Sequence, residues 1–221
     1  MKANKSRIFL VACFCVGMAQ ADVVFTTGNH PQPGEANVLL NSGGFGMTVT
    51  GTTNSLPGVV VDFTSTELEL EPSSGQARVS GDPEHTPLTD MTISLAGGAT
   101  YSDLIFNPFI GGCHACVKGG TGTVTVDALD SHGVAEMPSV FTYTIGNGNN
   151  FLTITTTNGE KIVSTQIQDA GGSFDDLRQP RISGFGATPV PEPSNYVPIM
   201  GLALGAIALL RRSGKRYSIP S

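Results

Sequence analysis

Alternation between polar and apolar residues decides the fold class, and it is clearest in the stretch Thr123-Val124-Thr125-Val126-Asp127-Ala128. Successive side chains of a β-strand point to opposite faces, so this stretch places both valines on one face and the polar side chains on the other. The stretch Thr66-Glu67-Leu68-Glu69-Leu70-Glu71 has the same pattern, with three carboxylates opposite two leucines. Both stretches predict strands that are buried on one side only.

Similar short segments, bounded by Gly, Pro, Asn or Asp, predict strands at 46–50, 59–64, 77–80, 92–95, 104–106, 140–145, 151–157, 162–167 and 181–184. Segments 140–145 and 151–157 flank Gly146-Asn147-Gly148-Asn149-Asn150, which predicts an antiparallel hairpin. The chain has 28 glycines and 14 prolines in 221 residues, a composition that favours many short strands over long helices. We therefore expect an all-β domain, an antiparallel β-sandwich of jelly-roll type.

The charged residues are unevenly distributed along the chain. All 18 acidic residues lie within residues 22–193, and this interval has only five basic residues, so its formal charge is −13. Those five are Arg78, Lys118, Lys161, Arg178 and Arg181. We expect no nucleic-acid binding, because a phosphate-binding surface needs clustered Lys and Arg. The two basic ends are expected to lie outside the folded domain.

Residues 1–21 have the three parts of a secretory signal peptide: a basic start, an apolar run at 8–18, and small residues at Ala19 and Ala21. We expect a signal helix that signal peptidase cleaves after Ala21. A permanent signal anchor is disfavoured, because the apolar run spans about 16 Å as a helix and the hydrocarbon core is about 30 Å thick. A lipoprotein box at Leu10-Val11-Ala12-Cys13 would leave too short an apolar segment before it.

The C-terminal end has three consecutive parts: a linker at 187–195 that contains Pro191, Glu192 and Pro193, an apolar segment at 196–210, and a basic tail at 211–221 that begins with Arg211 and Arg212. The prolines keep the linker extended. The apolar segment is about 22 Å long as a helix, so it can cross a bilayer with snorkelling arginines or local thinning. The basic residues then hold the tail in the cytoplasm.

This end resembles the PEP-CTERM sorting signal of Gram-negative bacteria, which is sometimes labelled an ice-binding protein C-terminal domain. The namesake motif is Pro191-Glu192-Pro193, and Arg211-Arg212 is the basic stop. The resemblance implies an exosortase-type transpeptidase as a partner, transient insertion into the inner membrane, and delivery of the domain at 22–186 to the cell surface or extracellular matrix. The alternative is an ordinary membrane anchor, which would explain the apolar helix and the basic residues but not the Pro-Glu-Pro motif.

Three segments of the domain, at 103–107, 149–154 and 176–184, resemble a recurring domain that precedes such tails. The resemblance implies a β-sandwich and no particular activity.

Cys113-His114-Ala115-Cys116 lies between glycine pairs, which predicts a loop. An exported compartment is oxidising, so a local disulfide between Cys113 and Cys116 is favoured. Free thiols, a redox pair, and a zinc site that adds His114 with His30 or His85 stay open. A c-type haem is excluded, because its attachment motif needs a histidine directly after Cys116.

Paired carboxylates could support glycoside hydrolysis, and the candidates are Glu67, Glu69, Glu71, Asp175 and Asp176. A solvated strand face explains the three glutamates, and a turn or a weak calcium loop is expected for the aspartates. The sequence therefore predicts no catalytic residue, cofactor or metal. We expect a non-catalytic surface or matrix protein, with adhesion or exopolysaccharide contact as its role. The alternatives are a secreted carbohydrate-active enzyme of glycoside-hydrolase type and a weak carbohydrate-binding module.

Overall fold

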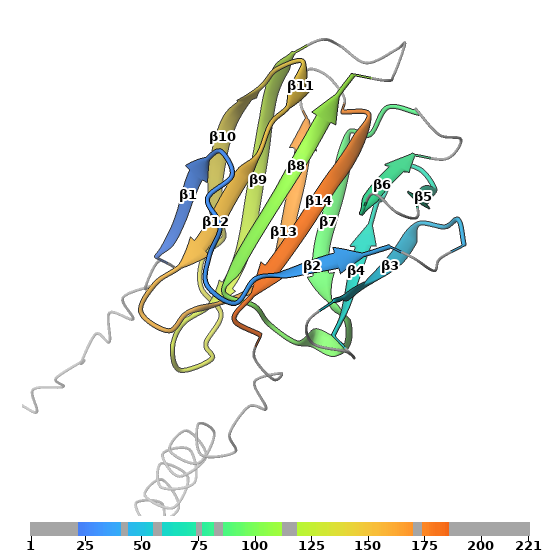
Figure 1. The fold of residues 1–221 in the computed structure, drawn as a ribbon. Coiled ribbons are helices and arrows are strands. Elements are labelled where there is room, and N and C mark those ends of the chain that lie inside the picture. Colours follow the sequence, from blue (N-terminus) through green and yellow to red (C-terminus); the bar gives the residue numbers. More distant parts are fainter. Residues whose placement is uncertain are drawn as a thin grey trace, which may run out of the picture.

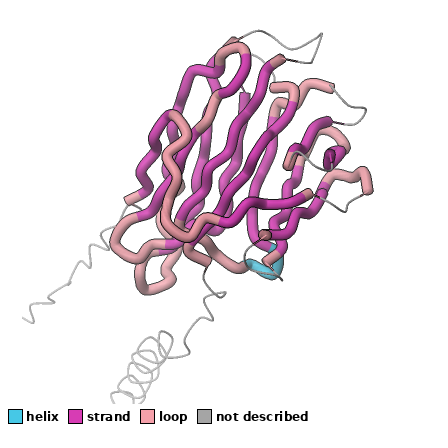
Figure 2. Tube along the Cα trace, in the orientation of Figure 1, coloured by secondary structure: helices cyan, strands magenta, loops and turns pink. Residues whose placement is uncertain are grey.

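The computed structural model describes residues 22–40, 44–54, 59–73, 77–81, 86–111, 119–169 and 174–185. These residues form strands and loops, together with one short 3-10 turn at Ala96–Gly98 (Figure 1; Figure 2). The prediction of an all-β domain is confirmed. The signal helix and the membrane helix that we predict lie outside the described residues.

In chain order the strands are β1 (Val23–Thr27), β2 (Ala36–Leu39), β3 (Thr48–Thr53), β4 (Val60–Thr64), β5 (Leu70–Ser73), β6 (Arg78–Gly81), β7 (Asp90–Leu95), β8 (Asp103–Ile110), β9 (Gly120–Leu129), β10 (Ser139–Ile145), β11 (Gly148–Asn149), β12 (Leu152–Thr156), β13 (Lys161–Asp169) and β14 (Asp176–Ser183). Every pairing between these strands is antiparallel. Most of the predicted strands are found, and β1 and β2 are strands that we did not predict.

The main strands follow one hydrogen-bonded path, in the order β1-β12-β8-β14-β2-β3-β4-β7-β13-β9-β10. β2 connects the two halves of this path, because its first half pairs with β14 and its second half pairs with β3. Figure 1 shows β12, β8 and β14 in front of β9, β13 and β7. The sheet therefore curls over itself around a shared core, nearly as a barrel does.

Side chains from both halves of the sheet fill this core. Phe63 of β4 and Phe106 of β8 are fully buried, as is Tyr101. In β9 the exposure alternates as predicted, because Val124 and Val126 are buried and the polar residues on either side of each are not. The alternating stretch that decides the fold class thus supplies one wall of the core.

Aromatic rings connect the two ends of the path, β1 and β10. Phe25 of β1 stacks on Phe141 of β10, with ring centroids 5.0 Å apart and planes 7° from parallel. Phe141 also stacks on Tyr143, at 6.3 Å. We call these three residues the aromatic seam. It brings the first and last strands of the sheet together and covers the core where the sheet ends meet.

The predicted hairpin at 140–157 is wrong. β10 pairs with β9, whereas β12 pairs with β1 and β8, so the chain crosses from one half of the sheet to the other between them. The side-chain amide of Asn150 holds the crossing segment by donating to the carbonyls of Gly146, Gly148 and Pro108. Gly and Asn residues favour tight turning in either case, so their presence does not distinguish a hairpin from a crossing.

The predicted strand at 66–71 is only partly correct. Residues 66–68 form a bend, and β5 begins at Leu70. The carboxylate of Asp90 causes the bend, because it accepts hydrogen bonds from the Ser65 hydroxyl and from both the amide and hydroxyl of Thr66. The predicted faces are partly correct, since Glu67 and Glu69 are exposed and Leu70 is buried, whereas Leu68 and Glu71 are both half-buried.

Candidate functional site

A groove of about 650 Å³ lies over β14 and its neighbours, and we call it the β14 groove. Its lining residues are Asn29, Asn37, Leu39, Ala77, Asn107, Asn149, Arg178, Gln179, Pro180 and Arg181. Adjacent residues of the same strands, such as Phe106 and Ile182, are buried in the core, so the groove is on the outer face of the sheet. Of the described residues that line it, five have side-chain amides, two have guanidinium groups and none has a carboxylate.

The groove exists because β14 changes partners along its length. Its first three residues pair with β6, and Arg181 and Ile182 pair with β2. Between them the register against β8 shifts, and Gln179 adopts a left-handed backbone with φ of 51°. Pro180 is tolerated at this bulge because a bulged residue need not donate to the strand ladder. β6 and β2 therefore diverge at the bulge, and the groove opens between them.

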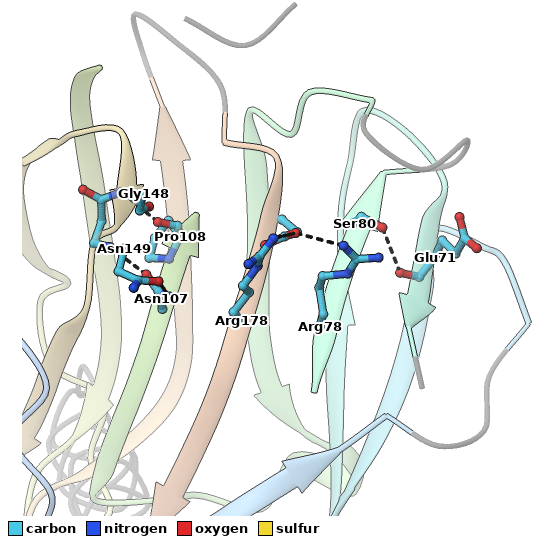
Figure 3. Close-up of polar contacts among 10 residues, drawn as sticks. Glu71, Arg78, Ser80, Asn107, Pro108, Gly148, Asn149 and Arg178 are labelled. Atoms are coloured by element: carbon cyan, nitrogen blue, oxygen red, sulfur yellow. Dashed lines mark hydrogen bonds and ion pairs between the residues drawn. The ribbon is translucent and has the colours of Figure 1, made fainter. Parts of the chain in front are cut away.

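Asp176 lies at the start of β14 with its side chain fully buried. Arg178 donates to both carboxylate oxygens, from Nε at 2.5 Å and from Nη2 at 2.8 Å, and Arg78 Nη1 lies 3.4 Å from one of them (Figure 3). Burial raises the pKa of Asp176, while the hydrogen bonds and charge of Arg178 oppose that rise. Asp176 is thus a strand residue with two cationic partners, so the expectation of a turn or calcium loop is wrong for Asp176, whereas Asp175 lies in a bend just before the strand.

The Phe109 ring also holds the guanidinium group of Arg178 in place. The guanidinium carbon lies 3.4 Å from the centroid of the Phe109 ring, a cation–π contact. The two bonds to Asp176 use two of the five N–H donors of the group, and the side chain is 25% exposed. Arg178 is therefore a positioned donor that still faces solvent in the groove.

The neighbouring wall consists of linked amides. The Asn107 amide donates to the Asn149 side-chain oxygen at 2.8 Å and accepts from the Asn150 backbone at 2.6 Å (Figure 3). Asn107 is buried, whereas Asn149 is exposed in the groove. The crossing segment is thus tied to β8, and its amide groups are held in defined orientations.

The segment between β1 and β2, residues 28–35, lies along another side of the groove, next to Arg181. Arg181 donates to the carboxylate of Glu35 at 3.2 Å and to the side-chain oxygen of Asn29. The backbone amide of His30 donates to Thr153 of β12, which attaches the segment to the outer face of the sheet. The segment closes one side of the groove.

Three of the five basic residues of the interval 22–193 thus lie at or beside the groove: Arg78, Arg178 and Arg181. Asp176 and Glu35 pair with them, so the groove is rich in hydrogen-bond donors without being strongly cationic. Sequence reasoning missed this convergence because residue 78 is far from residues 178 and 181 along the chain. The available signal was the occurrence of two arginines around Pro180 in a chain with few basic residues.

Of the carboxylates that the sequence suggests for catalysis, Asp176 lies beside the groove, bound to Arg178, and none of the five lines it. Glu67 and Glu69 are exposed beside β5, and the backbone carbonyl of Glu71 accepts from Ser80 at 3.5 Å (Figure 3). His30 is exposed, and its Nε2 lies 3.1 Å from the Thr27 carbonyl oxygen. Within the described ranges, no three His, Cys, Asp or Glu residues lie close enough to hold a metal ion.

Other predicted residues lie outside the described ones: Ala19, Ala21, His85, Cys113, His114, Cys116, Pro191, Glu192, Pro193, Arg211 and Arg212. The disulfide, the cleavage site and the sorting motif therefore stay predictions. In the part of the chain that the structure covers, no helix is long and apolar enough to cross a bilayer.

Comparisons of this chain with protein families, with curated proteins and with solved structures find no match. The guanidinium groups of the β14 groove can donate hydrogen bonds to uncharged polar ligands, and its side-chain amides can both donate and accept them.

Proposed function

We propose that the protein is a non-catalytic surface or matrix protein of a Gram-negative bacterium, and that its exported domain binds extracellular polysaccharide in the β14 groove. The lining of the groove supports this proposal. Side-chain amides and a fixed guanidinium both suit sugar hydroxyls and ring oxygens, which need donors and acceptors at close spacing. Because Asp176, Phe109 and Asn107 already hold these groups, little side-chain entropy is lost on binding.

The proposed architecture is an antiparallel β-sandwich of jelly-roll type. The change of partner at β2 supports it, because a single path of strands then supplies two facing halves. The core side chains that both halves contribute also support it. Sandwiches of this kind present an outer face that is free for ligands.

Export and sorting complete the proposal. Signal peptidase cleaves after Ala21, the segment at 196–210 holds the chain briefly in the inner membrane, and an exosortase-type transpeptidase cuts near Pro191-Glu192-Pro193. The two ends of the described domain support this scheme, because Asp22 binds Glu160 and the next residue, Lys161, binds the Gly184 carbonyl. The first and the last strand-flanking residues of the described domain, Asp22 and Gly184, therefore lie on the same side of it.

A carbohydrate-active enzyme would instead need two carboxyl groups about 5 to 10 Å apart in a cleft. The described lining of the groove offers amides and guanidinium groups, which favours binding over hydrolysis. The two functions predict different products from the same polysaccharide, since hydrolysis releases new reducing ends.

Binding is tested by affinity electrophoresis of the full chain, in detergent, through gels that contain the exopolysaccharide of the host. The variant Asn37→Trp places a bulky ring in the groove, and we expect it to weaken the retardation about tenfold. Its matched control is Thr142→Trp on the exposed face of β10. Equal retardation of both variants would reject the groove as the site, and release of reducing ends would favour the enzyme.

Processing is tested separately by intact-mass analysis of protein from the host. We expect the loss of residues 1–21 and of the tail. A species that still carries residues 196–221 would indicate an ordinary membrane anchor.

A further inference from the structure

The fold holds residue 22 by every polar group of its backbone. The Asp22 backbone nitrogen donates to Glu160 Oε2 at 2.7 Å, and its carbonyl accepts from the amide and hydroxyl of Thr157, both at 3.3 Å. The Asp22 carboxylate accepts from the Asn158 amide at 2.7 Å. All three partners lie in the turn between β12 and β13. This turn therefore forms a built site for one residue, the one that signal peptidase is expected to leave at the N-terminus.

The surroundings of the Asp22 nitrogen are strongly acidic. Burial raises the pKa values of Glu136 and Glu160, and repulsion from Asp130 and Asp22 raises both further. Glu160 also raises the pKa of Glu136, whereas the hydrogen bond from the Asp22 backbone lowers that of Glu160. Among the described residues, Glu136 Oε2 is a buried oxygen without a hydrogen-bond partner. The site therefore has an excess of negative charge.

The basic residues close to this site do not supply the missing charge. Lys161 directs its ammonium to the Ser102 hydroxyl at 2.6 Å and to the Gly184 carbonyl at 3.1 Å. His132 lies in the same loop as Asp130 and is exposed, and its contact with Asp130 is made by its backbone amide. A cation at the Asp22 nitrogen would be the direct complement to these carboxylates.

We propose that this fold binds its own mature N-terminus, with the α-ammonium of Asp22 as the cation for Glu160, Glu136 and Asp130. The inference depends on the cleavage after Ala21 that we propose above. In that step water adds across the Ala21–Asp22 peptide bond, the C–N bond breaks, the hydroxyl joins the Ala21 carbonyl carbon and a proton joins the Asp22 nitrogen. A neutral amide with one hydrogen thereby becomes an ammonium group with three.

Removal of the leader thus stabilises the domain, and the effect is specific to the position of the cut. An N-terminus one residue earlier moves the ammonium by about 3.8 Å, the spacing of consecutive Cα atoms. Coulombic attraction and hydrogen bonds to Glu160 both weaken at the longer distance. The carboxylates then select for a chain that begins at Asp22.

The test compares two chains in the same detergent, one of residues 22–221 and one of residues 21–221, each with a free N-terminus. Carboxylates that bind the ammonium raise its folded pKa above the unfolded value of about 7.7 to 8.0. The extra stability is complete below the unfolded value and is lost as the pH rises through the folded one. We expect the unfolding constant of the chain that begins at Asp22 to be about tenfold smaller than that of the longer chain near pH 6.5, and nearly equal to it well above the folded pKa.

Glu160→Gln should remove most of that difference, whereas Glu67→Gln, which changes an exposed carboxylate elsewhere, should leave it in place. If Glu160→Gln does not fold, the pKa of the Asp22 amine is read from the pH dependence of its acetylation in the unsubstituted chain. An unshifted amine pKa, or identical pH profiles for the two chains, would overturn the inference. Cleavage at another position in the host would contradict only the processing scheme, because the two purified chains have defined starts.

Discussion

The aromatic seam and the arginine pair beside the β14 groove both connect strands that are far apart in the sequence, but they do so by different physics. The seam joins Phe25 to Phe141 through ring contact. Beside the groove, Arg78 of β6 joins Asp176 of β14, 98 residues later, through charge and hydrogen bonds. Ring contact stabilises roughly in proportion to the buried area, whereas a buried charge depends on each of its partners.

This difference predicts how each region responds to substitution. Loss of one ring at the seam leaves a cavity that neighbours can partly fill. Loss of Asp176 leaves two guanidinium groups without their shared carboxylate, and water reaches them only partly. The groove region should therefore be the less tolerant of the two, although it is more polar.

The largest expected effect is that of Asp176→Ala. Removing one member of a buried ion pair costs about 3 to 5 kcal/mol, and we expect about 3 kcal/mol here because Arg178 is partly solvated. The measurement is urea unfolding of the full chain in detergent. Asp176→Asn is the matched control, since it keeps one oxygen acceptor and should lose less. A loss below about 1 kcal/mol for the alanine variant would contradict the stated role of the pair.

Phe141→Ala breaks the seam, and we expect a loss of about 2 kcal/mol in the free energy of unfolding. The ring is only partly buried, so the loss is smaller than that of a fully buried phenylalanine. Val140→Ala, at the adjacent and 63% exposed position, is the control and should change stability by less than about 0.5 kcal/mol. Equal losses in the two variants would show that the stacked rings contribute nothing specific.

Local alternation was sufficient to predict the strand at 123–128 and its buried face, because side-chain direction in a strand depends only on the strand itself. It did not predict the partners of a strand. Segments 140–145 and 151–157 are strands, as expected, but they belong to opposite halves of the sheet. Partner choice depends on contacts between distant residues, which a local pattern does not contain.

The β14 groove could not be predicted from the sequence for the same reason. It depends on the bulge at Gln179 and Pro180, where β14 leaves β6 and continues with β2. A proline cannot donate to a strand ladder, and the sequence predicts a strand only over 181–184, after Pro180. The geometry of the bulge and the position of Arg78 beside Asp176 can be seen only in the folded structure.

Two buried tyrosines allow a sharper comparison of core and seam. The Tyr101 hydroxyl lies 2.9 Å from the Thr165 hydroxyl, whereas the Tyr143 hydroxyl has no hydrogen-bond partner among the described residues. A tyrosine hydroxyl is already protonated at neutral pH, and burial raises the pKa of both side chains further. We expect Tyr101→Phe to lower the free energy of unfolding by about 1 kcal/mol and Tyr143→Phe to raise it by up to about 1 kcal/mol. The measurement is chemical denaturation of both variants at one pH. A lower free energy of unfolding for Tyr143→Phe would contradict the prediction and indicate a hydrogen-bond partner for the Tyr143 hydroxyl.

The smallest expected effect concerns the bulge that opens the groove. Gln179 has a φ of 51°, a conformation that costs a residue with a side chain about 1 kcal/mol and costs glycine almost nothing. Glycine loses more conformational entropy on folding, so Gln179→Gly should raise the free energy of unfolding by only about 0.3 to 0.5 kcal/mol. Thr142→Gly, at an exposed position within β10, has no such strain to relieve and should lower it by about 0.5 to 1 kcal/mol. Changes of opposite sign in the free energy of unfolding of the two variants would locate strain in the bulge. A lower free energy of unfolding in both variants would mean that the left-handed backbone at residue 179 is not strained.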